Sequence, residues 1–294
     1  MTFKYLSILT IILLFLLPAI IIDTGLTTSE STDNDRYLVI RADDFGMTHS
    51  ANMALKKLIE TGMPLSASVM PPTPWFLEAA EVLNEHPEVS VGVHLTLNSE
   101  WKNYRWGPVL GQEAVPSLVD ENGYFFPSSA DLYNNNPDMI ELERELKAQI
   151  RRALDAGLNV DYLDSHMGTA MGNPEFREVT ERVASEFDLV ISGNMDENFL
   201  SGLYWAPPES KLDSLRVMIP RAEPGINTVI VHVGLDTPEM AALVDMNVDN
   251  PLPDMCKHRY GELQAFTSDE FKNLVEESGV KLINYRDVIR RLEE

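Results

Sequence analysis

The stretch Tyr37–Gly46 reads YLVIRADDFG, and it decides how the rest of the chain is interpreted. Its first half, Tyr37–Arg41, is a nearly continuous apolar run, which is typical of a strand buried in a parallel sheet. The run leads directly into two adjacent acidic residues, Asp43 and Asp44. Because α/β proteins build their active sites where parallel strands end, the sequence predicts functional carboxylates at the C-terminal end of this strand.

Downstream, short apolar segments alternate with amphipathic ones. The further predicted strands are Leu65–Met70, Val89–Leu97, Val160–Asp164, Leu189–Ser192, Thr228–Val233 and Lys281–Asn284. The predicted helices run from a cap at Thr48 to Gly62 and over Pro74–Glu85, Asp138–Ala156, Pro174–Ser185, Ser268–Ser278 and Arg286–Leu292. This alternation predicts a parallel sheet in a single α/β domain spanning residues 35–294.

The charge of the chain narrows the choice of partners. Acidic residues outnumber basic ones, 46 to 23, which gives a formal net charge of −23. Such a field repels the phosphates of nucleic acids, so nucleic acid is excluded as a partner. A neutral substrate, or a product that becomes a cationic amine, is compatible with the charge, which also serves plain solubility. The sequence leaves the oligomeric state open, a homodimer included.

The first 34 residues differ from the rest. Lys4 precedes an uncharged, nearly all-aliphatic run of 17 residues, Leu6–Ile22, and a polar linker, Thr27–Asp35, follows it. The length of the run lies between the core of a signal peptide and a membrane-spanning helix of about 20 residues. We therefore expect residues 1–34 to be a signal peptide or membrane anchor with its linker. The domain would then lie outside the cytoplasm, secreted or held at a membrane.

Three histidines also fall at predicted strand ends, namely His94, His166 and His232. Asp44, His94 and His166 offer one carboxylate and two imidazoles, a set that suits a divalent ion with open positions for water and substrate. Asp43 could then act as general base, and His232 could protonate the leaving group. Imidazoles favour zinc, nickel or cobalt and the carboxylate also admits magnesium, so we expect one divalent ion, magnesium or zinc foremost.

Each of these residues also has a structural interpretation. The two aspartates could cap the helix that follows them, His94 could be a hydrogen-bonded core histidine, and His166 could be exposed in a turn. His49 and His86 have no supporting context and are assigned to the surface. His258 is ambiguous, in a stretch interpreted as a polar loop.

Taken together, these elements resemble the YdjC/ChbG-type carbohydrate deacetylases from about Tyr37 to the C-terminus. The resemblance rests on ADDFG at Ala42–Gly46, GVHLTLN at Gly92–Asn98 and LDSH at Leu163–His166, with weaker pieces VIVHVG at Val229–Gly234 and R-x-x-E-x-x-x-F-T-S at Arg259–Ser268. It implies an irregular (β/α) barrel related to polysaccharide deacetylases. It also implies a divalent metal at Asp44, His94 and His166, with Asp43 as base and His232 as assisting acid.

The resemblance further implies a hydrolase that removes acetyl groups from small N-acetylated sugars such as chitooligosaccharides. Two tryptophans in the long segment after His94, Trp101 and Trp106, could stack on a sugar face or form the core of that segment. One element departs from the family pattern, because many relatives continue with H-H-H-x-H where this chain has His166-Met167-Gly168-Thr169-Ala170. Two alternatives stay open: an O-acetyl esterase or other acyl hydrolase on the same scaffold and, motivated by this departure, a sugar-binding envelope protein without catalysis.

Overall fold

The computed structural model describes residues 34–247 and 254–294. The predicted signal or anchor segment, Leu6–Ile22, lies outside the described residues, so its role stays a prediction. Within the described ranges, no helix is both long enough and apolar enough to cross a membrane.

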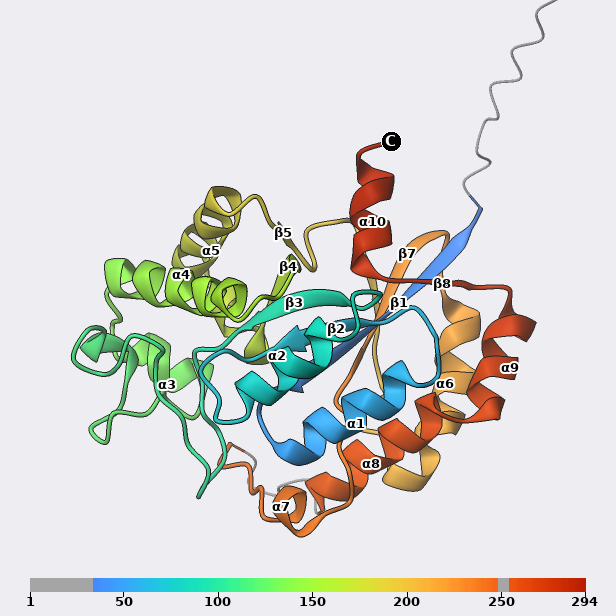
Figure 1. Cartoon of the computed structure of the whole chain (residues 1–294), viewed down its shortest axis with the longest axis horizontal. Coiled ribbons are helices and arrows are strands. Elements are labelled where there is room, and N and C mark those ends of the chain that lie inside the picture. The colour runs from blue at the N-terminus through green and yellow to red at the C-terminus, as the bar shows by residue number, and fades with distance from the viewer. Residues whose placement is uncertain (1–33, 248–253) are drawn as a thin grey trace, which may run out of the picture. The chain divides into compact units, whose positions relative to one another are not determined.

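An eight-stranded sheet forms the centre of the fold, and each of its strand pairs is parallel (Figure 1). The strands are β1 (Arg36–Phe45), β2 (Ser66–Val69), β3 (Ser90–Leu95), β4 (Val160–Ser165), β5 (Val190–Ile191), β6 (Asn198–Leu200), β7 (Gly225–Val231) and β8 (Lys281–Ile283). Their order along the sheet is β5-β4-β3-β2-β1-β7-β6, and β8 also pairs with β1.

The central strand, β1, is longer than the sequence predicts. One of its edges pairs with β7 from Arg36 to Ala42. Two other strands pair with different parts of β1: β8 pairs with Tyr37–Val39, and β2 pairs with Arg41–Phe45. The two aspartates therefore belong to the strand itself, at its C-terminal end, instead of following it.

The two edge strands of the sheet, β5 and β6, follow each other in the chain and are separated only by residues 192–197. Ser192 and Glu197, at the two ends of this connection, both hydrogen-bond to the hydroxyl of Tyr285. Within the described residues β5 and β6 do not pair, so the sheet is a curled half-barrel. This confirms the predicted irregular barrel-type α/β fold in a single domain.

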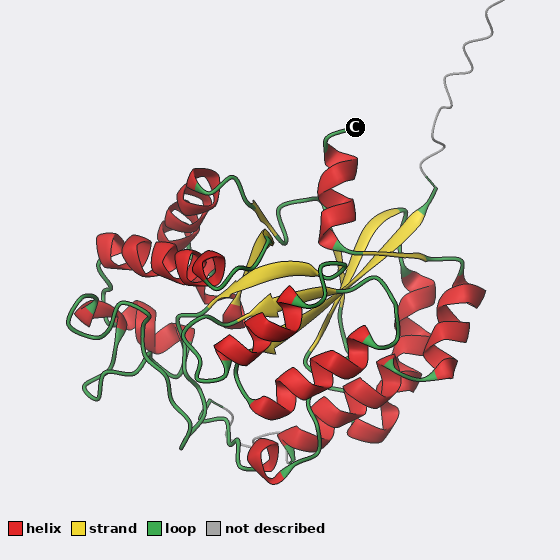
Figure 2. Cartoon of the chain, in the orientation of Figure 1, coloured by secondary structure: helices red, strands yellow, loops and turns green. Residues whose placement is uncertain are grey.

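Helices surround the sheet (Figure 2). The longer ones are α1 (His49–Ile59), α2 (Phe76–Asn84), α4 (Met139–Asp155), α5 (Pro174–Glu186), α6 (Lys211–Met218), α8 (Met255–Phe266), α9 (Asp269–Ser278) and α10 (Tyr285–Leu292). Short turns of helix are α3 (Ser129–Asn134), α7 (Pro238–Ala241), η1 (Pro116–Leu118), η2 (His166–Met171), η3 (Pro208–Ser210) and η4 (Ile219–Arg221).

The first and last of the longer helices are fixed by specific polar contacts. The predicted cap of α1 is confirmed, because the Thr48 hydroxyl accepts a hydrogen bond from the backbone N–H of Ala51. At α10, the backbone N–H of Tyr285 donates to the Ser66 hydroxyl, and Arg286 pairs with Asp161. Both partners lie where strands begin, so α10 covers the end of the half-barrel opposite to the strand ends that carry Asp43 and Asp44.

Side chains alternate between the two faces of the sheet, as the pleat requires. On the outer face, β1 contributes Leu38 and Ile40 to the main apolar core under the helices. On the inner face, Arg41 and Asp43 hydrogen-bond to each other. The fold therefore has an apolar outer layer and an inner face that carries a small apolar cluster, with Val39 and Tyr162, and becomes polar toward the C-terminal ends of the strands.

Candidate active site

The end of β1 brings two neighbouring carboxylates to one place. Consecutive strand residues point to opposite faces, yet Asp43 and Asp44 both line a single cavity of about 360 Å³. The backbone of Asp44 allows this, since its φ of 68° is in the left-handed region, at a cost of about 1–2 kcal/mol for an L-residue. We call this cavity, which also contains His94, His166 and His232, the site cavity.

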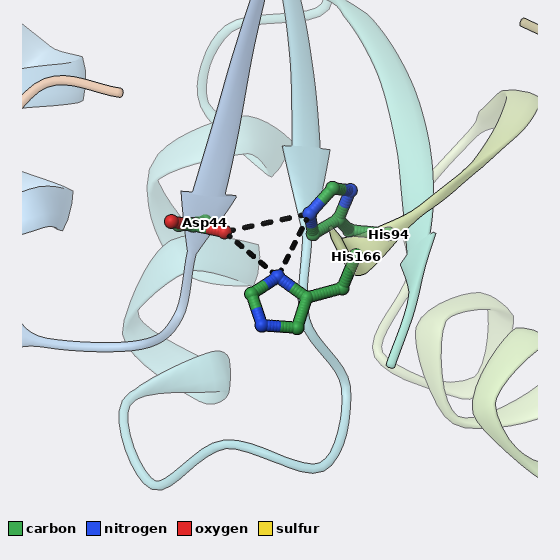
Figure 3. A group of neighbouring side chains, drawn as sticks. All are labelled: Asp44, His94 and His166. Atoms are coloured by element: carbon green, nitrogen blue, oxygen red, sulfur yellow. Dashed lines mark hydrogen bonds and ion pairs between the residues drawn. The ribbon is translucent and has the colours of Figure 1, made fainter. Parts of the chain in front are cut away.

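Asp44, His94 and His166 converge on one point (Figure 3). Asp44 Oδ1 lies 3.4 Å from His94 Nε2 and 3.3 Å from His166 Nδ1, and the two ring nitrogens are 3.2 Å apart. Tetrahedral ligands about 2.0–2.1 Å from an ion are separated by about 3.3–3.4 Å. The predicted cluster is thus brought together with the spacing of a metal site, although its role as a ligand set stays a prediction.

The far side of each imidazole contacts a carboxylate. His94 Nδ1 is 2.8 Å from Asp164 Oδ1, and His166 Nε2 is 3.1 Å from Glu100 Oε2. A carboxylate accepts a hydrogen bond from the N–H of the ring, which leaves the other ring nitrogen with a lone pair. Both lone pairs then face Asp44 Oδ1, a buried oxygen that has no hydrogen-bond partner among the described residues.

The carboxylates around the two histidines favour positive charge. Burial alone would lower the pKa of His94, but Asp164 and Asp43 raise it well above its usual value. Burial also acts to lower the pKa of His166, and Glu100 and Asp44 outweigh it and bring that pKa to about 9. A divalent cation between the three donor atoms would satisfy the same electrostatic demand as protons on the rings.

The second oxygen of Asp44 is held by an arginine. Arg259 Nη2 donates to Asp44 Oδ2 at 2.6 Å. Burial alone would raise the pKa of Asp44, but Arg259 and the two histidines hold it well below its usual range. The carboxylate therefore stays charged, as a metal ligand must be.

Asp43 has a different environment. Arg41 Nε and Nη2 donate to its two carboxylate oxygens at 2.9 and 2.7 Å, and Arg41 Nε is also 2.9 Å from Asp164 Oδ2. Asp43, His94 and Asp164 form a second group with metal-like spacing. Because the Arg41 guanidinium already neutralises both of these carboxylates, the first group is the better cation site.

His232 lines the site cavity immediately after β7, as predicted. Its Nδ1 is buried without a hydrogen-bond partner among the described residues, and its ring packs edge-on against Tyr204. Burial, the largest effect, lowers the pKa of His232 to about 4. The imidazole is therefore neutral near pH 7, and its ring forms part of the cavity wall.

The structure selects the core interpretation of Trp106 and corrects the loop assignment of His258. Trp106 does not line the site cavity, because it is buried and its indole N–H donates to the backbone oxygen of Asn98. Trp101 forms part of the cavity wall, but it too is buried.

His258 does not lie in a polar loop, since Met255–Phe266 is helix α8. His49 and His86 do pair with surface glutamates.

The sequence did not identify four residues that complete the site: Arg41, Glu100, Asp164 and Arg259. Two of them had a detectable signal, because Arg41 and Asp164 occupy the same strand ends as Asp43 and His166 and follow the period of two. Glu100 follows β3 in an irregular segment. Arg259 lies on α8, which is buried on several sides and therefore lacks an amphipathic pattern.

A curled parallel sheet with carboxylates and histidines gathered in a cavity at its strand ends is the arrangement of an α/β-type enzyme with a candidate metal site. The family follows from most of the chain, because the model of the YdjC-like protein family matches residues 37–277. The chain belongs to the YdjC-like family. This confirms the predicted resemblance.

Relatives of the chain carry the name carbohydrate deacetylase. The one from Enterococcus faecalis (strain ATCC 700802 / V583) is 28% identical over 267 residues, covering 87% of this chain and 99% of the relative. The one from Thermus thermophilus is 34% identical over 234 residues, covering 71% and 82%. The prediction of a deacetylase-type enzyme is thereby confirmed at the level of the family.

Solved structures agree on the fold. A protein from Enterococcus faecalis V583, described as a cellobiose-phosphate cleavage protein, superposes with a TM-score of 0.71 at 25% identity, covering 86% of this chain and 99% of that one. The Xyl-CE4 domain of a multidomain xylanase from the hindgut metagenome of Trinervitermes trinervoides gives a TM-score of 0.50 at 8% identity, covering 88% and 92%. The second likeness concerns the fold alone.

Proposed function

We propose that this chain is a metal-dependent hydrolase that removes acetyl groups from N-acetylated sugars. The observation that carries the proposal is the convergence of three donor atoms, on Asp44, His94 and His166, at 3.2–3.4 Å from one another. Three lone-pair atoms this close repel one another unless positive charge lies between them. The names of the relatives in the family support the choice of acetylated sugars as substrates.

The residues present fit a divalent ion. Asp44, His94 and His166 would hold it, and Asp164 and Glu100 would orient the two imidazoles from behind. Such an ion, when bound, supplies Lewis-acid chemistry by polarising an amide carbonyl and lowering the pKa of a water molecule. Its identity, magnesium or zinc foremost, follows from ligand preference alone.

The chain's own residues would handle the protons. Asp43, held by Arg41, would accept the proton of the water whose oxygen attacks the acetamide carbon. The C–N bond then breaks and the leaving nitrogen takes up a proton, which gives acetate and a free amine. His232 is neutral at rest, so it would deliver that proton only after receiving one, and its ring lines the cavity in which the transfer would occur.

The departure from the family pattern after His166 bears on the substrate. Met167 and Gly168 line the site cavity, whereas Thr169 and Ala170 are buried, Thr169 bonding to Asn98. Only the first two of the four positions after His166 therefore face a ligand. We infer that the difference alters contacts with the sugar and leaves the donor atoms unchanged, so that chitooligosaccharide-like substrates remain the best choice.

Two isosteric variants test the proposal. Asp44→Asn should weaken metal binding, and added metal should restore part of the activity. Asp43→Asn should retain the metal and lose about 10²–10⁴ in rate, the usual contribution of a general base. The measurements are metal content and acetate release from N-acetylglucosamine and its β-1,4-linked oligomers, over a metal titration and with chelator.

Asp161→Asn is the matched control, because Asp161 lies at the opposite end of β4 and pairs with Arg286. It should leave metal content and rate unchanged. Full acetate release by chelated protein, or normal activity of both aspartate variants, would reject the mechanism. Release from O-acetyl esters without release from amides would select the esterase alternative.

A further inference from the structure

A second hollow lies next to the site cavity and shares one residue with it. This side cavity has a volume of about 670 Å³, within the size range of small-molecule sites. It lies between α8 and the segment around η3, where α8 contributes Lys257, His258 and Gln264. Trp205 lines both the side cavity and the site cavity.

Aromatic rings connect the two cavities. The ring of His232 packs edge-on against Tyr204, with centroids 5.4 Å apart, and Tyr204 packs edge-on against Trp205 at 5.0 Å. Trp205 nevertheless leaves 66% of its surface exposed. An exposed indole next to a polar cleft is the usual means of covering the apolar face of a ring-shaped ligand.

A histidine in the wall of the side cavity has a buried ring nitrogen that lacks a partner. His258 is 93% buried, and its Nδ1 has no hydrogen-bond partner among the described residues. A buried polar atom without a partner costs about 1–3 kcal/mol and usually indicates a missing ligand or water. Two walls of the side cavity are fixed against each other, because Gly261 lets α8 approach Pro208 so closely that a Cβ would lie 2.4 Å from the Pro208 carbonyl oxygen.

We propose that the side cavity binds the neighbouring sugar unit of an oligosaccharide whose acetylated unit occupies the site cavity, with Trp205 as the stacking surface between the two. The inference rests on the proposed function and names the substrate more closely. An aromatic face combined with imidazole, amide and carboxylate groups is suited to a sugar ring, which has apolar faces and a rim of hydroxyls.

The charges of the side cavity define the unit that it accepts. Glu209 and Asp254 are acidic, and the single lysine, Lys257, forms an ion pair with Asp236. No cation of the side cavity is left to bind a phosphate among the described residues. The neighbouring unit is therefore uncharged, or a cationic glucosamine, in preference to a phosphorylated sugar.

The test compares substrates of one and two units. Gln264 is exposed and lines only the side cavity, so Gln264→Trp should fill that cavity and leave the site cavity intact. We expect its kcat/KM on N,N′-diacetylchitobiose to fall about three- to tenfold through KM, the size of one lost stacking contact. Its kcat/KM on N-acetylglucosamine should stay unchanged.

Trp205→Ala should also raise KM for the disaccharide, and Trp205→Phe should restore most of the loss. Trp75→Ala is the matched control, because Trp75 is exposed as well and lines neither cavity. Equal losses on both substrates in Gln264→Trp, or no loss on either, would overturn the inference.

A binding measurement separates failure of this inference from failure of the proposed function. Disaccharide that covers Trp205 should shift the tryptophan emission of the wild type to shorter wavelength, and the shift should be absent in Trp205→Phe. If the wild type releases no acetate but this shift appears and is larger with the disaccharide than with N-acetylglucosamine, the proposed function fails and the side cavity still binds sugar. If acetate is released but the emission of wild type and Trp205→Phe responds alike, the side cavity is not the subsite.

Discussion

The outer and inner faces of the half-barrel are made from alternate residues of the same strands, yet they have opposite chemistry. On β3, Val93 is part of the apolar core, and the next residue, His94, belongs to the site. On β4, Leu163 is part of the apolar core, and the next residue, Asp164, hydrogen-bonds to His94. A step of one residue therefore separates the groups that stabilise the fold from those that form the site.

The two faces are also stabilised differently. The outer face gains free energy by burying apolar surface under helices, about 25 cal/mol per Å². The inner face buries charges, which is costly unless each finds a partner, and here Arg41 bridges Asp43 and Asp164. Outer-face changes should therefore act on stability, and inner-face changes on metal binding and rate.

The largest effect is expected on the inner face, from His94→Ala. It removes one of the three converging donor atoms, and the loss of Lewis-acid catalysis, worth several kcal/mol, should lower kcat by about 10³-fold or more. The fold should survive, because Asp164 keeps its bonds to Arg41 and Ser68. Acetate release, metal content and circular dichroism of the same sample measure this.

The neighbouring outer-face variant, Val93→Ala, is the control for that experiment. It should retain metal and turnover per folded molecule. If His94→Ala retained metal and activity, the three-atom cluster would be a structural hydrogen-bond group, and the distinction between the faces would lose its functional meaning.

The second prediction concerns the outer face. Leu163 is fully buried, and Leu163→Ala should lower the free energy of unfolding by about 2–5 kcal/mol, the usual cost of a leucine-sized cavity. KM and metal affinity should change little, because the inner-face contacts of β4 remain. Urea unfolding, with kinetics of the folded protein, is the measurement. A metal-affinity loss as large as that of a ligand variant would contradict independence of the two faces.

The contrast between the faces also explains what the sequence could predict. Apolar runs such as Tyr37–Arg41 identified β1, and the histidines at the ends of β3 and β4 identified the site, because both signals are local. The barrel-type fold was accessible only through the family resemblance, and the sheet order was not predicted. The short strand β6 and helix α6 were missed, since neither has a strong periodic pattern.

Residues whose role depends on a tertiary contact could not be identified from local sequence patterns. Arg259 reaches Asp44 across 215 positions in the chain, and Glu100 reaches His166 across 66. Nothing near either residue in the sequence shows which group it will contact. The sequence could not decide between a sugar platform and a core position for Trp106 for the same reason, and the exposed Trp205 drew no attention.

A third, smaller effect is expected from Asp164→Asn, which alters the group behind a predicted ligand. Asp164 accepts from His94 Nδ1 and from Ser68. The amide has the same shape without the charge, so metal affinity should fall about 10–100-fold, the usual cost of losing such an outer contact. Saturating metal should restore most of the rate, which distinguishes it from His94→Ala. Metal-independent loss of rate would instead assign Asp164 a direct part in the chemistry.

The smallest effect is expected at the far end of the polar interior, from Tyr285→Phe. The Tyr285 hydroxyl bonds to Ser192 at 2.5 Å and to Glu197 at 2.6 Å, and Ser192 accepts from Arg41 at 2.8 Å. Without the hydroxyl, Ser192 can still donate to Glu197, 3.2 Å away, and Arg41 keeps both of its bonds to Asp43. The loss should therefore be about 1 kcal/mol of stability, the net worth of one hydrogen bond, with less than about a threefold change in kcat.

The matched control for Tyr285→Phe is Tyr37→Phe, which removes a hydroxyl that bonds at the surface to Asp35 and should cost less stability. Thermal unfolding and kcat, measured for both variants, check the prediction. A fall in kcat of a hundredfold in Tyr285→Phe alone would mean that the bond chain from Glu197 through Ser192 to Arg41 sets the position of Asp43. The position of the base, Asp43, would then depend on the Tyr285 hydroxyl at the start of α10, far from the three donor atoms. The expected small change in kcat would instead show that catalysis depends on the groups at the strand ends. Arg41 would then be the residue farthest from the donor atoms that catalysis requires.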